Sequence, residues 1–135
     1  MNKYLTFSLL FVLISSTTTF AQAEISIDQR LYDVFDATFL KKLQTDKSFH
    51  LHYYNFSLDN SYDIIEIPKE KNMKLAEVKI KDLSKINILK LQQEQKLTKS
   101  YDTPTYYQIK GSDKILMIRS EKDFVKRLNL HLGRI

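Results

Sequence analysis

Cysteine is absent from the 135-residue chain, and glycine and proline occur only twice each. Without cysteine the protein has no disulfide and no metal cluster built on thiolates, so packing alone must hold its fold together. Loops that cradle a phosphate need several glycines close together, and two glycines in the whole chain exclude them. The motifs G-x-S-x-G and H-E-x-x-H are also absent, so the sequence predicts no catalytic residue and no cofactor.

Charge is mixed along the chain rather than gathered in one place. The chain has 21 Lys and Arg against 16 Asp and Glu, a formal net charge of +5. The lysines are interspersed with acidic residues, and no recognisable nucleic-acid-binding module is present. Since specific nucleic-acid binders usually concentrate positive charge on one face, we expect no specific nucleic-acid partner.

The first 23 residues have the layout of a secretory signal peptide. A basic start at Lys3 precedes an apolar run over residues 5–14, and a Ser/Thr-rich stretch leads to Ala21-Gln22-Ala23. A membrane-spanning helix needs about 20 mostly apolar residues, and the polar residues 15–19 interrupt this run after about ten. We therefore predict cleavage after Ala23, with cleavage after Ala21 as the alternative.

The remaining residues, 24–135, have the size of one domain. No repeat, low-complexity tract or linker divides them, and no cysteine follows the apolar run to carry a lipid. We expect a single exported domain, periplasmic or secreted, with no stable membrane anchor after cleavage.

Helical spacing is present at both ends of this predicted domain. Ser26 and Gln29 have the spacing of a capping box, and apolar residues then recur at three- and four-residue steps, which predicts a helix from about Ile27 to Gln44. Ser120 begins a second helix in the same way, and Gly133 is placed to end it. Both helices should pack on one face of a sheet.

Between the helices, apolar and polar residues alternate as in strands. We predict strands over residues 48–54, 62–67, 75–81, 105–109 and 114–120, with hairpin turns at 58–61 and 110–113 and an end at Pro68. Residues 82–100 fit two structures: a helix capped by Asp82, or a turn at 82–85 and a strand from Ile86. Two β-branched residues in residues 86–91 favour the strand.

Taken together, these elements predict an α+β domain. It has an N-terminal helix, a mostly antiparallel sheet of about five strands and a C-terminal helix.

Two histidines are the first candidates for a ligand site. On a regular strand the side chains of His50 and His52 point to the same face, where paired imidazoles can hold zinc or copper if a third ligand approaches. His131 is the only other histidine, and it belongs to the last helix near the face that should meet the core. We expect the three not to converge, and we predict no metal site.

Tyrosines are frequent in the predicted strands and at their edges. On an exposed sheet face they can stack on sugars, peptides or partner proteins, although half of any alternating strand is buried by ordinary packing. The residues that we predict at a ligand- or partner-binding face are His50, His52, Tyr54, Tyr106 and Tyr107.

Three segments carry a resemblance to known sequences: Asn-Phe-Ser-Leu-Asp-Asn-Ser-Tyr at 55–62, Ile-Lys-Asp-Leu-Ser-Lys-Ile-Asn-Ile-Leu at 80–89, and Tyr-Tyr-Gln-Ile-Lys-Gly at 106–111. In these segments the chain resembles a family of small exported bacterial proteins of uncharacterised function. The resemblance implies a bacterial periplasmic or secreted setting and no particular activity.

Two functions of different class remain open. The first is a non-catalytic binding or interaction protein of the bacterial cell envelope, which holds an unidentified protein or envelope partner with an aromatic sheet face or at a free sheet edge. The alternative is a protein that binds a small ligand or a metal with His50 and His52, with or without catalysis. The sequence favours the first.

Overall fold

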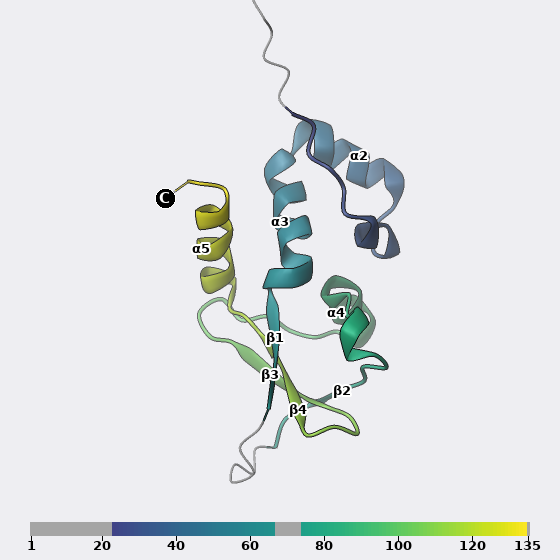
Figure 1. The fold of residues 1–135 in the computed structure, drawn as a ribbon, viewed down its shortest axis with the longest axis vertical. Helices are drawn as coiled ribbons and strands as arrows, with labels where there is room; N and C mark the ends of the chain where they lie inside the picture. The colour runs from purple at the N-terminus through teal and green to yellow at the C-terminus, as the bar shows by residue number, and fades with distance from the viewer. Residues whose placement is uncertain (1–22, 67–73, 135) are drawn as a thin grey trace, which may run out of the picture.

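The computed structural model describes residues 23–66 and 74–134 (Figure 1). Residues 1–22, which carry almost all of the predicted signal peptide, and the predicted strand end at Pro68 lie outside them. The described chain contains the 3₁₀ helix η1 (Gln29–Asp33), α2 (Ala37–Asp46), α3 (Ser48–Asn60), β1 (Tyr62–Glu66), β2 (Glu77–Val78), the 3₁₀ helix η2 (Leu83–Lys85), α4 (Ile88–Gln95), β3 (Thr105–Ile109), β4 (Lys114–Ile118) and α5 (Glu121–His131). The predicted α+β class is confirmed.

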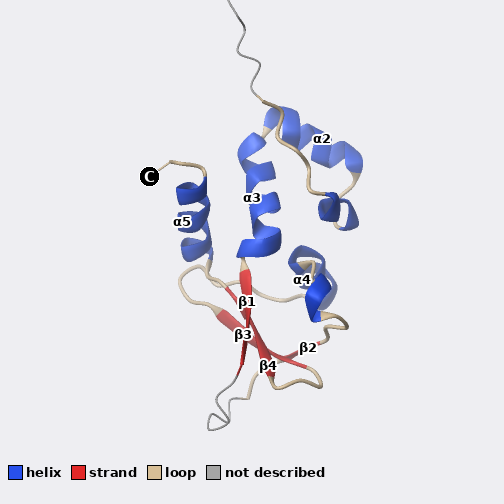
Figure 2. Cartoon of the chain, in the orientation of Figure 1, coloured by secondary structure: helices blue, strands red, loops and turns tan. Residues whose placement is uncertain are grey.

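The four described strands form one mixed sheet in the order β1-β4-β3-β2 (Figure 2). β4 pairs antiparallel with both β1 and β3, and β2 pairs parallel with β3. The prediction of a mostly antiparallel sheet is therefore confirmed in outline, with one fewer described strand than expected and one parallel pair.

The hairpin β3–β4 and the helix α5 are as predicted, because local signals specify both. At the hairpin Gly111 has a φ of +76°, which glycine adopts without strain, and Ser112 donates its N–H to the Ile109 carbonyl at 3.1 Å. At α5 the Ser120 hydroxyl accepts the Asp123 N–H at 3.2 Å, and Gly133 follows the helix with a φ of +67°.

The predicted strand over residues 48–54 is wrong, because these residues begin α3. Leu51 and Leu58 of α3 are fully buried in a cluster with η1 and α2. On another side of the same helix, the Tyr53 and Phe56 rings lie 4.9 Å and 5.6 Å from the ring of Phe124 in α5. A helix packed on two sides is apolar most of the way round, so its 3.6-residue period is hidden and the sequence resembles an alternating strand.

The predicted hairpin turn at 58–61 is also wrong. Ser61 ends α3, and its hydroxyl donates to the Ser57 carbonyl at 2.6 Å. The chain then runs from α3 directly into β1 (Figure 1).

The predicted N-terminal helix is interrupted, because aspartates begin a helix twice. Asp28 accepts the Arg30 N–H at 2.9 Å and starts η1, so Ser26 and Gln29 do not form the predicted capping box. Asp36 accepts the Phe39 N–H at 2.9 Å and starts α2. An aspartate favours the cap over the helix interior, so Asp36 divides the expected helix in two.

Within residues 82–100 the turn is confirmed, as η2, but the strand from Ile86 is wrong. Asn87 accepts the Lys90 N–H at 3.2 Å and caps α4, so residues 88–95 are helical, but the helix begins later than the alternative capped by Asp82. The residues after Ile88 are Leu, Lys, Gln and Glu, which are strong helix formers and outweigh the β-branched pair. The predicted strand over 75–81 is reduced to Glu77–Val78.

Most of the core lies in two clusters that share Leu89 of α4. The first packs α4 against one face of the sheet, and the second joins η1, α2 and α3. α2, α3 and α5 lie beyond one end of the sheet (Figure 1), so the first and last helices do not cover a sheet face as predicted. The buried members are Val78, Ile86, Ile88, Tyr107, Ile109, Leu116 and Ile118 in the first cluster and Leu31, Leu40, Leu43, Leu51 and Leu58 in the second.

The packing of α3 predicts unequal effects of two substitutions. Leu51→Ala should lower the free energy of unfolding by about 2–5 kcal/mol, because Leu51 is fully buried. Phe49→Ala should cost clearly less, since Phe49 is only partly buried and its ring lies 4.8 Å from the Arg134 guanidinium near the surface. Urea denaturation of both variants measures the difference. Equal losses would contradict the helix, because only a strand puts residues 49 and 51 on one face.

Candidate functional site

One edge of the sheet is formed by β1, and the backbone of β1 has a defined orientation there. Arg119 donates its N–H to the Ser61 carbonyl at 2.9 Å. Because hydrogen-bonded pairs alternate along an antiparallel ladder, the backbone groups of Asp63 and Ile65 then face β4, and those of Tyr62, Ile64 and Glu66 face outward.

The same alternation is visible on the other side of the sheet, which supports this orientation. Gln108 and Lys110 donate their N–H groups to the Ala76 and Val78 carbonyls, each at 2.9 Å, so even-numbered residues of β3 face β2. Within residues 23–66 and 74–134, no hydrogen bond from outside the sheet reaches the outward backbone groups of Tyr62, Ile64 or Glu66. They form an edge open to another strand.

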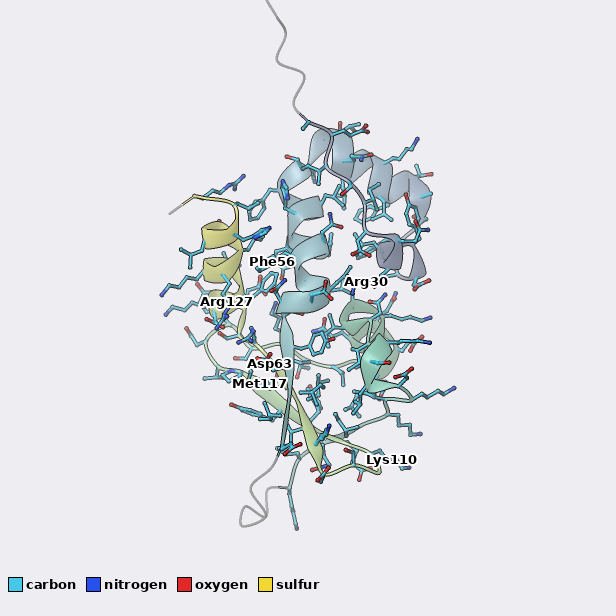
Figure 3. All side chains as sticks on the ribbon, in the orientation of Figure 1. Arg30, Phe56, Asp63, Lys110, Met117 and Arg127 are labelled. Carbon is cyan, nitrogen blue, oxygen red and sulfur yellow. The ribbon has the colours of Figure 1, made fainter. Side chains whose placement is uncertain are left out.

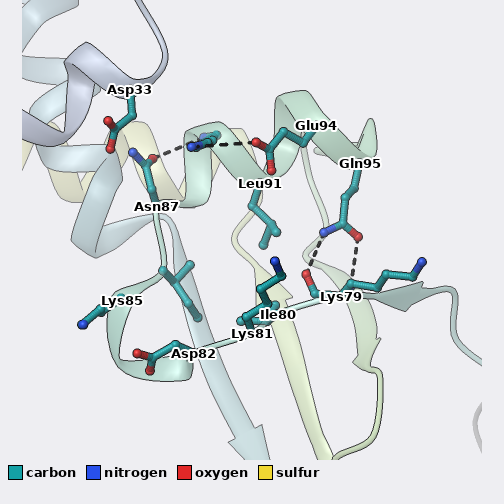
Figure 4. A pocket seen from close by; sticks show the side chains of 12 residues that line it. Asp33, Lys79, Ile80, Lys81, Asp82, Lys85, Asn87, Leu91, Glu94 and Gln95 are labelled. Atoms are coloured by element: carbon teal, nitrogen blue, oxygen red, sulfur yellow. Dashed lines mark hydrogen bonds and ion pairs between the residues drawn. The ribbon is translucent and has the colours of Figure 1, made fainter.

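The opposite edge of the sheet is short and is capped at one end. β2 has two residues, and the Gln95 side chain of α4 occupies the position next to it. The Gln95 amide accepts the Lys79 N–H at 2.9 Å and donates to the Lys79 carbonyl at 2.8 Å (Figure 4). A side-chain amide thus makes the two bonds that a neighbouring strand would make, and short, capped edges of this kind resist pairing with other chains.

The sheet face opposite α4 carries apolar side chains. Leu116 and Ile118 pack toward α4, so Ile115 and Met117 of the same strand point to the other face. Figure 3 labels Met117 and Asp63 on the side of the sheet away from α4. Ile115 is 4% exposed and lies between its cross-strand partners Ile65 and Gln108.

Arg119 anchors the start of β1 to its surroundings. Its guanidinium forms ion pairs with Asp63 of β1 and, at 3.6 Å, with Asp123 of α5, and its Nε donates to the Asn60 carbonyl at 3.2 Å. The side chain is 17% exposed, so the pairs are partly shielded from water. The charge of Asp63, beside the open edge, is therefore already neutralised.

The structure separates the two predicted histidine ligands. Residues two apart on a helix point about 200° apart, so the prediction that His50 and His52 share a face is wrong. His50 lines a hollow with Tyr53 and Tyr54, whereas His52 lines another with His131. Within the described ranges, no three His, Asp or Glu side chains gather in a way that could hold a metal ion.

Of the three predicted tyrosines, one lies on an exposed sheet face. Tyr54 belongs to α3, where its ring packs 4.7 Å from that of Phe35. Tyr107 is buried, and its hydroxyl accepts the Thr98 N–H at 2.9 Å. Tyr106 is 37% exposed and points to the face opposite α4. The predicted aromatic face is thus reduced to Tyr106 beside Met117, with which it pairs across β3 and β4.

A polar cluster that the sequence did not predict joins α3 to α5. The Tyr53 hydroxyl donates to Glu121 at 2.8 Å, and Lys99 Nζ lies 2.7 Å from Glu121 and 4.4 Å from the centre of the Phe124 ring. Burial, and then the hydrogen bond with Glu121, raise the pKa of Tyr53 well above its usual value. Tyr53 therefore stays protonated at neutral pH and is neither base nor nucleophile. Its partners lie 46 and 68 residues away, which no sequence pattern indicates.

A groove of about 540 Å³ lies between α4 and the segment from β2 to η2 (Figure 4). Its charges are mixed: four lysines face two aspartates and Glu94. Lys90 lies 3.9 Å from Glu94, and Asp82 accepts the Ser84 N–H at 2.9 Å. Such a balance is typical of a solvated surface and gives no marked preference for an anion. The four lysines are Lys79, Lys81, Lys85 and Lys90, and the two aspartates are Asp33 and Asp82.

Comparison of the chain with protein-family models, curated proteins and solved structures finds no match. Among the described residues, no helix has the length and apolar character needed to cross a membrane.

The raised pKa of Tyr53 predicts a dependence of stability on alkaline pH. The folded protein keeps Tyr53 protonated at a pH where the unfolded chain loses that proton, so the free energy of unfolding should fall as the pH rises above about 10. Urea denaturation between neutral pH and pH values above this limit measures the slope, and Tyr53→Phe should make it shallower.

The matched control is Tyr101→Phe, since Tyr101 is 66% exposed. This variant should keep the slope of the unmodified protein. An unchanged slope in Tyr53→Phe would show that the Tyr53 hydroxyl does not contribute to the alkaline loss of stability.

Proposed function

We propose that the protein is an exported, non-catalytic binding protein of the bacterial cell envelope that holds an extended segment of a partner by adding it as a strand beside β1. One observation carries this proposal: the backbone groups of Tyr62, Ile64 and Glu66 face outward with no partner in the described chain, whereas β2 has only two residues and Gln95 caps the residue that follows it. Backbone pairing at a free edge supplies affinity, and pockets for alternate side chains supply specificity.

The exported setting rests on the sequence. The N-terminal layout is that of a signal peptide, and the resemblance noted above points to small exported bacterial proteins. The lack of cysteine means that the edge works without a disulfide or a thiolate-bound metal.

Three observations favour the edge over the other candidates. The aromatic face is reduced to Tyr106, which is too small a surface for recognition by stacking. His50 and His52, on which the alternative depends, line different hollows of α3. Tyr53, whose pKa is strongly raised, is engaged in bonds that join α3 to α5.

Glu66 allows the edge to be tested without disturbing the core. Its side chain is exposed and its N–H faces outward, so Glu66→Pro removes an outward donor and leaves the β1–β4 hydrogen bonds in place. Peptides selected from a random library on the immobilised protein should bind Glu66→Pro about tenfold more weakly, because one backbone bond is lost. Glu66→Ala, which keeps the N–H, should bind normally. The affinities are measured by calorimetry.

Amide chemical shifts locate the bound peptide independently. Binding should move the amide signals of Tyr62, Ile64 and Glu66 most. Selected peptides that bind both Glu66 variants equally, without shifting these signals, would contradict the proposal.

The histidines provide a second test. His50→Ala/His52→Ala should leave peptide affinity unchanged, because both residues belong to the first half of α3 and no residue of β1 lines their hollows. Loss of peptide binding in a variant that still folds, judged by circular dichroism, would indicate that the peptide binds at the surface of α3 and not at β1.

A further inference from the structure

We propose that the strand added beside β1 is β1 of a second copy of this chain, so that two molecules form a continuous eight-stranded sheet about a twofold axis at Ile64. This inference rests on the proposed function and names the partner of the same edge. An edge that pairs with itself must be self-complementary in hydrogen bonding, in side-chain charge and in shape.

The hydrogen bonding is self-complementary, and one antiparallel register uses all three outward-facing residues of β1. With Ile64 opposite Ile64 of the second copy, Tyr62 lies opposite Glu66 and Glu66 opposite Tyr62. These are the residues whose N–H and C=O groups face outward, so each of these pairs can exchange two backbone hydrogen bonds. The whole length of β1 is then used.

The charges favour the same register. On the face opposite α4, Asp63 lies across from Ile65 of the second copy, and the charge of Asp63 is neutralised by Arg119. Moving the axis to Asp63 would place two aspartates directly opposite each other, which destabilises a strand pair. Moving it to Ile65 would leave two outward-facing pairs within β1 in place of three.

The shape of the molecule permits the pairing. α3 continues straight from the start of β1, so antiparallel strands put the two α3 helices at opposite ends of the shared sheet (Figure 1). The apolar faces opposite α4 become continuous, because Ile65 of each copy lies beside the new strand. A sheet extended across the axis also covers the longer of the two described sheet edges.

The absence of cysteine makes this register directly testable. Ile64→Cys introduces a single thiol that should lie about 5.5 Å, measured between Cα atoms, from its equivalent in the second copy, which is within disulfide range. Mild oxidation should therefore convert most of this variant to a covalent dimer. Ile65→Cys is the matched control, because residue 65 faces residue 63 of the second copy and takes no part in the Arg119 ion pairs, and it should cross-link far less.

Light scattering after gel filtration measures the self-association of the unmodified protein. The mass should rise toward that of a dimer with increasing concentration. Glu66→Pro should raise the dissociation constant of the dimer by about ten- to a hundredfold, because the hydrogen bond donated by the backbone N–H of residue 66 is lost in both molecules. Glu66→Ala keeps this N–H and should leave the dissociation constant unchanged.

Three results would overturn the inference. They are a mass that stays monomeric at every concentration with no cross-link through Ile64→Cys, equal cross-linking of both cysteine variants, and a dimer unaffected by Glu66→Pro. A monomer whose edge still binds selected peptides would reject self-pairing and keep the proposed function, whereas failure of both experiments would reject both.

Discussion

The hydrogen bond from the Arg119 N–H to the Ser61 carbonyl fixes the alternation of β1. It joins the last residue before β1 to the first residue after β4, and it determines which backbone groups of β1 face β4 and which face outward. The Arg119 side chain adds bonds to Asn60 and Asp63 and an ion pair with Asp123 at the start of α5. One residue therefore holds together the end of α3, the start of β1 and the start of α5, and a shift of one position there would turn the open edge inward.

A second connection couples the helices to the sheet. Leu89 of α4 contacts both core clusters, and the preceding Asn87 donates its side-chain amide to the Arg30 carbonyl of η1 at 2.8 Å. Gln95 at the other end of α4 caps the β2 edge. α4 thus covers a sheet face, caps one end of the β2 edge and contacts the helical layer, whereas the outward backbone groups of β1 have no partner among the described residues.

The sequence was sufficient where local signals agreed. The β3–β4 hairpin has alternation, a glycine turn and polar turn residues at the right positions, and α5 has a cap, an apolar stripe and a glycine end. It failed where an element packs on two sides, as α3 does, because burial on both sides removes the helical period. It also failed where competing caps occur, as at Asp28 and Asp36, since a spacing pattern does not show which cap the chain uses.

The candidate site could be predicted only in part, for a different reason. The strand over residues 62–67 was expected, and its limits agree closely with those of β1. That β1 lies at an edge depends on its pairing with β4, about 50 residues later in the sequence. That the other edge is capped at one end depends on a contact between Lys79 and Gln95, 16 residues apart. Long-range pairing of this kind leaves no pattern in a single sequence.

An open edge of five residues also sets a limit on how strongly the protein can bind. Each backbone hydrogen bond contributes about 1 kcal/mol net, and association costs several kcal/mol in lost freedom of motion. Backbone bonds alone would therefore give weak, reversible binding. Tighter binding needs apolar burial beside the strand, which the face around Ile65 and Met117 can supply. The exposed Glu66 opposes pairing with unrelated strands, because a charge at the end of an edge strand discourages indiscriminate pairing. Short length, charge at one end and an adjoining apolar face together favour a partner whose side chains match, over any strand that happens to meet the edge.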